Sequence, residues 1–458
     1  MERWGIQVEI KNKPQLDKNF IPLNKFNEAF LKTAHEPFAV AVERADKQIA
    51  AWHTFIHGTA AMAKADIYFL ERMIKAVLWL KGGFRIYLAG NRSICAELAK
   101  IFAANGKRAF DYKFMSGVYE HEFEVVVCDK IPPEYSKSEA LGRHLDGCRI
   151  GFDAGGSDRK VSAVIDGKPV YSEEVVWFPK ITADPEYHFN EIVTAMKTAA
   201  AKMPRVDAIG ISSAGVYINN RTMNASLFLK VSPSDFEKKV KDIYIRAAKE
   251  IGDVPVVVCN DGDVTALAGA MSLDADNILG IAMGTSEAVG FVDKDGKVTG
   301  WLNELAFMPL DANPEAEEDE WSGDIGVGCK YFSQDAVIKL APQAGIELDP
   351  ELSPAEKLKV VQGLMLADDE RAAAIYRSIG TYLGHALAFY YDFYKFEYVL
   401  LLGRVMSGKG GDIIMAEAKR VLADEYSDLA AVIKLTLPDE KFRRVGQSVA
   451  AASLPELK

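Results

Sequence analysis

Apolar and polar positions follow a recognisable order from residue 148 onward. The segments CRIGFDAGG (148–156) and VSAVIDGKPVYSEEVVW (161–177) predict three strands joined by tight turns, with Asp166-Gly167 as a hairpin signal. A helical pattern at about 187–203 and the apolar strand VDAIGISSAG (206–215) follow. The sequence therefore predicts a unit of three strands, one helix and a fourth strand.

Residues 277–458 repeat much of this scheme. NILGIAMGTSEAVGFVDKDGKV (277–298) contains two apolar runs separated by a turn, and Asp295-Gly296 marks the next hairpin. Two amphipathic helices are expected at about 370–394, followed by a buried strand at 398–403 and a helix at about 411–424. The segment EKFRRVGQSVAAASL (440–454) predicts a last helix whose small residues suit close packing.

The front of the chain shows a similar order. FAVAVERADKQIAAWHTFIHG (38–58) predicts strands, 66–83 a helix and FRIYLAG (84–90) another strand, so that Ile49 aligns with Val161 and Tyr68 with Tyr187. Two interpretations stay open: a degenerate partial repeat that has lost the double glycine, or an unrelated α/β domain. IPPEYSKSEALGRHLDG (131–147) has the composition of a linker. We therefore expect an N-terminal domain over 1–130 and two lobes over 148–270 and 271–458.

Composition narrows the classes of function. A chain of 458 residues is too long for one ordinary domain, and its net charge of −11 disfavours nucleic-acid binding, which needs a basic surface. Its 5 cysteines form no CxxC pair, so neither a disulfide framework nor a zinc cluster is expected. The sequence shows no signal-peptide pattern and no apolar run of membrane length. We expect a reduced cytoplasmic protein with neither a nucleic-acid nor a membrane partner.

A glycine-rich turn follows the strand at 148–154. Asp153 stands near the end of that strand, where a carboxylate can hold Mg²⁺, usually through water. Gly155 and Gly156 leave room for backbone N–H groups to approach phosphate oxygens. Ser157 can donate its hydroxyl to phosphate, and Lys160 is a nearby cation. The alternative is an ordinary hairpin turn.

A second candidate stands at the end of the apolar run VVVC (256–259). Polar side chains at the carboxyl end of a buried parallel strand lie where α/β sheets bind ligands. Asp261 can accept the proton of an attacking hydroxyl, and Asn260 can hold the molecule that carries it. The alternative is that Asp261 only caps the helix that follows.

In this order the segments resemble the ROK (repressor, open reading frame, kinase) family of sugar kinases, from about residue 148 to the end. DAGGS (153–157) is similar to the phosphate motif D-x-G-G-T, and NDGDVTALAGA (260–270) to N-D-A-N-A-A-A-L-G, whose Asp is the catalytic base. NELAFMP (303–309) is similar to the sugar-binding stretch E-x-G-H-M-P, so Glu304 is expected to bind sugar hydroxyls. Gly215 stands in the family's V-P-G-P-V segment and Ser226 at its sugar-binding N-L pair.

Other positions depart from the family. Gly284 and Thr285 remain from its second phosphate loop, but Glu287 would put a charge beside a triphosphate. Gly403 remains from the adenosine-site G-G-G-V-S, where Arg404 can either stack on adenine or block the pocket.

The zinc ligands of the family are also reduced. Phe307 replaces its zinc-binding histidine, and Cys329 alone remains of three cysteines, so we expect no zinc. The acidic stretch 312–324 is expected to be solvated.

The resemblance implies an α/β protein of the ribonuclease H-like, actin-like ATPase fold, with two lobes and an added N-terminal α/β domain. It implies ATP-dependent phosphorylation of a hexose or amino-sugar hydroxyl, with Asp261 as general base, Mg²⁺ at Asp153 and ATP as cofactor. The alternative is a sugar-sensing or scaffold protein of the same fold without catalysis. A repressor is disfavoured because 1–147 shows no basic recognition helix, and a homodimer is left open.

Overall fold

The computed structural model describes residues 1–136, 141–438 and 440–457, with the side chains of 440–445 set aside. The chain divides into two compact, discontinuous units. The first unit comprises Met1–Lys137, Ile281–Val289 and Trp301–Thr436, and the second comprises Ser138–Gly280, Gly290–Gly300 and Leu437–Lys458. These limits differ from the expected domain limits at 130, 147 and 270, which stay a prediction.

A five-stranded sheet forms the centre of the second unit, in the order β13-β10-β7-β8-β9. Strands β7 (Cys148–Ala154), β8 (Asp158–Ile165) and β9 (Lys168–Val176) are antiparallel, and helix α5 (Pro185–Ala200) leads to β10 (Ala208–Ser213), which is parallel to β7. Strand β13 (Val256–Asn260) is parallel to β10. The predicted order of three strands, one helix and a fourth strand is confirmed.

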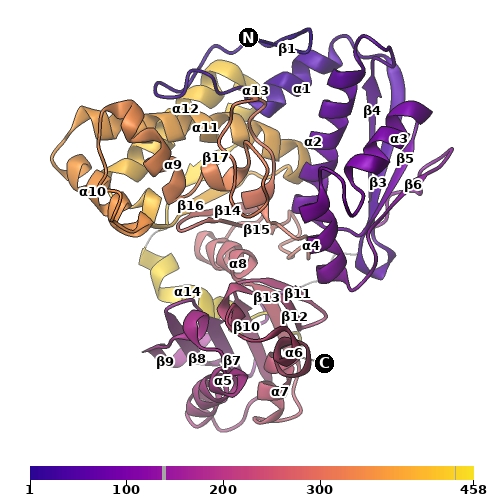
Figure 1. The fold of residues 1–458 in the computed structure, drawn as a ribbon. Helices are drawn as coiled ribbons and strands as arrows, with labels where there is room; N and C mark the ends of the chain where they lie inside the picture. The colour runs from indigo at the N-terminus through magenta and orange to yellow at the C-terminus, as the bar shows by residue number, and fades with distance from the viewer. Residues whose placement is uncertain (137–140, 439, 458) are drawn as a thin grey trace. The chain divides into compact units, whose positions relative to one another are not determined.

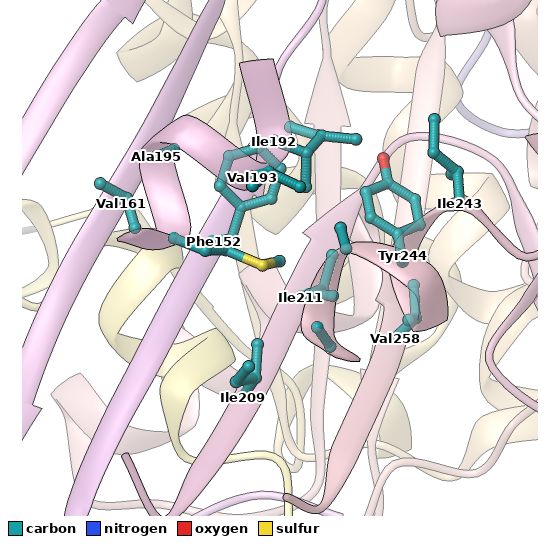
Figure 2. Packing of buried hydrophobic residues seen from close by; sticks show 14 of the residues in the cluster. Phe152, Val161, Ile192, Val193, Ala195, Ile209, Ile211, Ile243, Tyr244 and Val258 are labelled. Atoms are coloured by element: carbon teal, nitrogen blue, oxygen red, sulfur yellow. The ribbon is translucent and has the colours of Figure 1, made fainter. Parts of the chain in front are cut away.

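Helices cover both faces of this sheet. Figure 2 shows Phe152 and Ile211 of the sheet packed with Ile192 of α5 and with Tyr244 of α7 (Ile243–Lys249). Helices α8 (Asp261–Leu273) and α14 (Glu440–Ala452) pack on β10, and α14 also packs on β7 and β8. Gly151 and Gly210 permit the close approach of α14, because a Cβ at either would collide with its backbone.

The front of the first unit is a four-stranded sheet in the order β4-β3-β5-β6. Its strands are β3 (Glu36–Glu43), β4 (Ile49–Ile56), β5 (Arg85–Ala89) and β6 (Glu124–Val127), and α2 (Ala63–Lys81) connects β4 to β5 (Figure 1). Helices α3 (Arg92–Ile101) and α4 (Ala109–Tyr119) precede β6, and α1 (Leu23–Leu31) precedes β3.

The direction of β5 argues against the degenerate-repeat interpretation. Strand β5 is antiparallel to β3, whereas the corresponding β10 is parallel to β7. The front segment has two antiparallel strands, β3 and β4, before helix α2, whereas the later unit has three, β7 to β9, before α5. With one strand fewer, the chain leaves the sheet at the opposite end, and the strand after the helix runs in the opposite direction. The structure therefore favours the unrelated α/β domain.

The rest of the first unit is built on a sheet of order β15-β14-β16-β17. Strands β14 (Ile278–Met283) and β15 (Glu287–Val292) each have residues in both units, because the first unit takes only Ile281–Val289 from this part of the chain. Strands β16 (Tyr398–Leu402) and β17 (Lys434–Thr436) complete it, with helices α9 (Gln334–Leu340), α10 (Pro354–Leu366), α12 (Lys409–Glu425) and α13 (Ser427–Ala430). Two helices were predicted at 370–394, but α11 (Glu370–Tyr394) is one continuous helix, which has no proline to break it.

The other described elements are short. They are β1 (Glu2–Arg3), β2 (Ile6–Gln7), β11 (Val216–Ile218), β12 (Arg221–Asn224), α6 (Pro233–Asp235), the π-helical turn Phe236–Val240, and 3₁₀ turns at Ala45–Lys47, Pro179–Ile181, Ser226–Phe228, Leu305–Phe307, Gly328–Lys330, Pro342–Ala344 and Arg404–Met406. No helix within the described ranges is long and apolar enough to cross a bilayer.

Residues 137–140 of the expected linker lie outside the described residues. On either side of them the segment is held by hydrogen bonds. Tyr135 pairs through its backbone with Ile49, and the Arg143 backbone N–H donates to Ser453 Oγ over 3.0 Å. Preferential cleavage within 131–147 stays a prediction.

Candidate active site

Two carboxylates lie at one edge of the sheet in the second unit. Asp153 is near the end of β7, and Asp261 begins α8 directly after β13. Register brings these strand ends together, because Asp153 is opposite Ser212 of β10 and Asn260 is opposite Ser213. The sequence predicted both positions from the same pattern, an apolar run that ends in polar residues.

Asp153 is 6% exposed, and its Oδ1 accepts a hydrogen bond of 2.8 Å from the Ser212 hydroxyl. Burial raises the pKa of this carboxyl to about 6, and the charge of Asp261 acts in the same direction. An aspartate that is only weakly acidic still ionises at neutral pH, so Asp153 can present a hard oxygen ligand there.

Asn260, and not Asp261, caps helix α8. Its Oδ1 accepts from the Gly262 N–H over 2.7 Å, while its Nδ2 donates to the Gly215 carbonyl over 2.7 Å. The Asp261 carboxylate accepts a 3.0 Å bond from the Gly262 N–H, and burial raises its pKa. The alternative that Asp261 serves only as the cap is therefore disfavoured.

The turn between β7 and β8 contains Gly155, Gly156 and Ser157. A Cβ on Gly156 would lie 2.9 Å from the ammonium of Lys180, so the missing side chain leaves room for that cation. Lys180 also lowers the pKa of Asp261 by its charge. The expected cation, Lys160, instead lies 3.5 Å from Asp158 Oδ1 and 3.8 Å from Glu174 Oε2.

Sequence reasoning missed Lys180. It belongs to the short turn Pro179–Ile181, where nothing in the pattern distinguishes it from other exposed lysines. Lys180 comes close to Gly156 only because the chain folds back after β9, and this tertiary contact has no local sequence signal. The Ser157 hydroxyl is exposed and donates to Asp158 Oδ2 over 3.0 Å.

A buried hydroxyl cluster supports the loop that holds Gly215. Tyr217 donates to Ser213 Oγ over 2.7 Å, and Ser213 also shares a 2.7 Å bond with Tyr244. Gly215 has φ +133°, and a Cβ there would lie 2.7 Å from the Ala225 side chain, so this position requires glycine. Ser226 begins the next turn and is half-buried.

The other expected residues belong to the first unit. Gly284 and Thr285 form the turn between β14 and β15, where the Gly284 N–H donates to Ser286 O over 3.0 Å. Gly403 (φ +100°) follows β16, and a Cβ there would collide with the backbone of Met283. The turn residue Gly284 and Gly403 thus lie at neighbouring strand ends, and the Arg404 side chain is exposed.

Glu287 does not put a full charge on this turn. It is 4% exposed, its Oε1 accepts from Tyr390 over 3.3 Å, and burial raises its pKa to about 8. The carboxyl is therefore mostly protonated at neutral pH. Because the Glu287 carboxyl is buried and mostly neutral, it would not repel a triphosphate as the sequence suggested. The alternating pattern of a short strand does not reveal this burial.

Replacing Glu287 with glutamine should change the pH dependence of stability. The pKa of Glu287 is about 8 in the folded protein against an ordinary value of 4.5, so between these values the folded state alone binds the proton. The free energy of unfolding then falls as pH rises, by up to about 1.4 kcal/mol per pH unit. We expect the free energy of unfolding of Glu287→Gln to exceed that of the wild type by up to about 4 kcal/mol at pH 9, and to be nearly equal to it at pH 5. An offset that is equal at both pH values would contradict the assignment.

Glu304 is half-buried, and its backbone N–H donates to Trp79 O over 3.0 Å. Phe307 packs against Trp79 and Phe110, with ring centroids 4.5 and 5.7 Å apart. An aromatic cluster with the front segment therefore occupies the position where the resemblance implied a histidine. In the described ranges no group of three or more His, Cys, Asp or Glu side chains could hold a metal ion, and the absence of zinc stays a prediction.

The acidic stretch 312–324 is only partly solvated, which corrects the sequence expectation. Asp319 and Asp324 are each 4% exposed. Asp324 Oδ1 accepts from Arg72 over 3.0 Å, and its Oδ2 lies 2.9 Å from Lys75 and 2.8 Å from Arg108. Charge composition alone predicted solvent exposure, because the cationic partners are about 215 to 250 residues away in the sequence.

Known proteins share this fold at low sequence identity. No protein-family model and no curated protein matches the chain. A ROK-family glucokinase from Streptomyces griseus, crystallised with glucose and AMPPNP, is 20% identical, with a TM-score of 0.50 over 68% of this chain and 99% of that one. A ROK hexokinase from Thermus thermophilus is 18% identical (TM-score 0.52, 67% and 97%).

A ROK-family transcriptional regulator, a homologue of the E. coli MLC protein, is also similar. It is 18% identical, with a TM-score of 0.51 over 68% of this chain and 79% of that one. The fold is therefore shared by enzymes and a regulator, and the part of the chain outside the match leaves room for an extra domain. Over about two-thirds of its length, the chain has the fold of the ROK sugar kinases.

Proposed function

We propose that this protein is an ATP-dependent kinase that phosphorylates a hydroxyl of a hexose or amino sugar, with Asp261 as the general base. The main support is that Asp153 and Asp261 lie at one edge of the same sheet. They are close enough for the charge of Asp261 to raise the pKa of Asp153. Asn260 takes the capping role, and the Asp261 carboxylate can accept a proton.

The same edge suits the phosphate end of a nucleotide. Because Gly156 has no side chain, the Lys180 ammonium can lie at this edge, and the acceptor-only carboxylate of Asp153 suits hydrated Mg²⁺. Mg·ATP would supply the phosphoryl group. Lys180 would attract the phosphate oxygens and help keep Asp261 ionised, because its charge lowers the pKa of that residue. Gly284, Thr285 and Gly403 are proposed as further nucleotide contacts.

For the sugar we propose Glu304, Asn260, Gly215 and Ser226. Carboxylate and amide oxygens accept from sugar hydroxyls, and the Asn260 amide keeps one N–H beyond its bond to Gly215. The glucose and AMPPNP bound to the Streptomyces griseus glucokinase support these two classes of ligand.

A coupled assay of ADP release tests the proposal. The purified full chain, Mg²⁺ and ATP would be combined with a panel of hexoses, N-acetylhexosamines and free amino sugars. We expect at least one sugar to raise ADP release well above the sugar-free rate. ADP release that no sugar stimulates would contradict the kinase assignment.

The second candidate is a sugar sensor of the same fold. It is favoured by the similarity to a regulator and by Arg404 and Val405, which replace glycines expected at the adenosine site. Calorimetry separates the two functions. A kinase binds both sugar and nucleotide, whereas a sensor binds the sugar with no nucleotide heat at millimolar Mg·ATP.

Arg404 should contribute to a weak nucleotide site. Its side chain is exposed and Val405 is fully buried, so the guanidinium is the group available to stack on adenine. We expect ATP to bind in the upper micromolar range or more weakly, and Arg404→Gly to weaken binding about two- to fivefold, the scale of an exposed cation–π contact. Arg404→Gln, which replaces the planar guanidinium with a planar amide, should lose less. Tighter binding by Arg404→Gly would show that Arg404 obstructs the site.

A further inference from the structure

Lys180 lies in a short segment, residues 177–181, which follows β9 in the second unit and is here called the strap. Most of its side chains face solvent: Phe178 is 58% exposed, Ile181 is 73% exposed, and Lys180 is exposed as well. A segment with few buried apolar contacts is not held in place by its own packing. The position of Lys180 beside Gly156 therefore depends on the hydrogen bonds that attach the strap to its surroundings.

Trp177 attaches the start of the strap to the glycine-rich turn. Its indole is 1% exposed, and the indole Nε1–H donates to the Gly155 carbonyl over 2.7 Å. The Trp177 backbone N–H donates to the Ser157 carbonyl over 3.2 Å. These two bonds fix where the strap begins relative to the turn. Lys180 lies three residues further on, so a second attachment must fix its own position.

Helix α5 supplies this second attachment through Tyr187 and His188. The Tyr187 hydroxyl oxygen accepts a 2.9 Å bond from the Phe178 N–H. His188 is 0% exposed, and its Nε2 lies 3.0 Å from the carbonyl oxygen of Pro179, the residue directly before Lys180. Because a carbonyl oxygen can only accept, the His188 ring donates to it. The peptide that leads into Lys180 is thus bonded to the helix.

The His188 ring is itself held firmly. Its Nδ1 lies 3.0 Å from the Asp184 carbonyl oxygen, and the ring packs against Phe228 with the centroids 5.0 Å apart. Further along α5, Ile192 and Met196 are both 0% exposed and belong to the core between the helix and the sheet. The strap is therefore attached to a helix that the core fixes in position, which is what an accurately placed binding group requires.

We propose that Tyr187 and His188 are positioning residues, which act on the phosphates of Mg·ATP only through Lys180. This inference rests on the proposed kinase function, in which Lys180 attracts the phosphate oxygens. A lysine is a point charge on a flexible stem, so its contribution to phosphate binding depends on how firmly its backbone is placed. When α5 releases the strap, Lys180 leaves its place beside Gly156 and the affinity for Mg·ATP falls.

Two substitutions of His188 separate its two ring nitrogens. Glutamine can place an amide N–H near the position of Nε2 and keep the bond to Pro179, whereas asparagine reaches only the position of Nδ1. Binding of Mg·ATP would be measured by calorimetry on the full chain. We expect His188→Asn to bind about three- to tenfold more weakly than the wild type, and His188→Gln to stay within about twofold of it.

A double-mutant cycle with Lys180 decides whether His188 acts through it. Lys180→Met should weaken Mg·ATP binding about tenfold, whereas Lys168→Met, at an exposed lysine at the start of β9, is the control and should leave it unchanged. In the Lys180→Met background we expect His188→Asn to have no further effect. An equal loss in both backgrounds would show that His188 acts elsewhere, and would overturn the inference.

Tyr187→Phe decides the question if His188→Asn does not fold, as judged by circular dichroism. It removes the acceptor of the Phe178 N–H with little change in packing. Mg·ATP binding should weaken about two- to fivefold in the wild-type background and stay unchanged in the Lys180→Met background. The same loss in both backgrounds would refute the role assigned to α5.

The assay of ADP release separates this inference from the proposed function. Sugar-stimulated ADP release by the wild type, together with unchanged Mg·ATP affinity in His188→Asn or in Lys180→Met, would overturn the inference and leave the kinase assignment intact. No binding of Mg·ATP to the wild type at millimolar concentration would overturn both.

Discussion

Replacing Asp261 with asparagine should lower kcat by at least about 100-fold, the usual scale for loss of a general base, while sugar binding stays measurable. Asparagine keeps the size of the side chain but cannot take up the proton of the sugar hydroxyl. The substitution should not unfold the protein, because burial raises the pKa of Asp261 and a neutral amide is less costly to bury than a carboxylate. Rates would be measured by ADP release, and sugar binding by calorimetry.

Asp274→Asn is the matched control for this experiment. Asp274 is an exposed aspartate directly after α8, in a left-handed conformation that asparagine also adopts readily. It should retain the wild-type rate. Turnover in Asp261→Asn within a few fold of this control would show that another group, or water, receives the proton.

The sheet edge proposed as catalytic could be predicted because its signals are local. Asp153 and Asp261 each follow an apolar run, and parallel strands deliver such residues to one edge of a sheet. Lys180 could not be predicted in this way. Its place beside Gly156 depends on how the chain returns after β9, and no local pattern encodes that return.

The first unit shows a second limit of sequence reasoning. The order of strands and helix along the sequence suggested that the front segment repeats residues 149–215. It lacks the third strand, however, and β5 is therefore antiparallel to β3. In α2 the apolar pattern predicted the helix correctly, yet Glu71, Arg72 and Lys75 of that helix are all buried. Charged residues are seldom buried unless they are paired, and pairing over such sequence distances leaves no local signal.

This buried ion cluster carries the largest expected effect on stability. It joins Glu71, Arg72 and Lys75 of α2, Arg108 and Asp111 at the start of α4, and Asp324. Asp324 contacts all three cations and is the member that comes from the acidic stretch. These cations hold the pKa of Asp324 at about 2, although burial alone would raise it.

Asp324→Ala should lower the free energy of unfolding by about 3–5 kcal/mol, because three buried cations would be left with two carboxylates. The pKa of Asp324 is depressed, so this contribution is present above its ordinary value of 3.8 and is lost as pH falls toward 2. Wild type and variant should therefore differ strongly in urea midpoint at pH 7 and much less near pH 2.

Two further variants make this test specific to charge. Glu318→Gln removes an exposed carboxylate from the same stretch and should change stability by less than about 0.5 kcal/mol. Adding Lys75→Met to Asp324→Ala removes one of the unpaired cations, and should recover part of the loss if uncompensated buried charge is its cause. If the double variant is less stable than Asp324→Ala by the full cost of Lys75→Met alone, the two residues are not coupled. The loss would then come from packing around the Asp324 side chain.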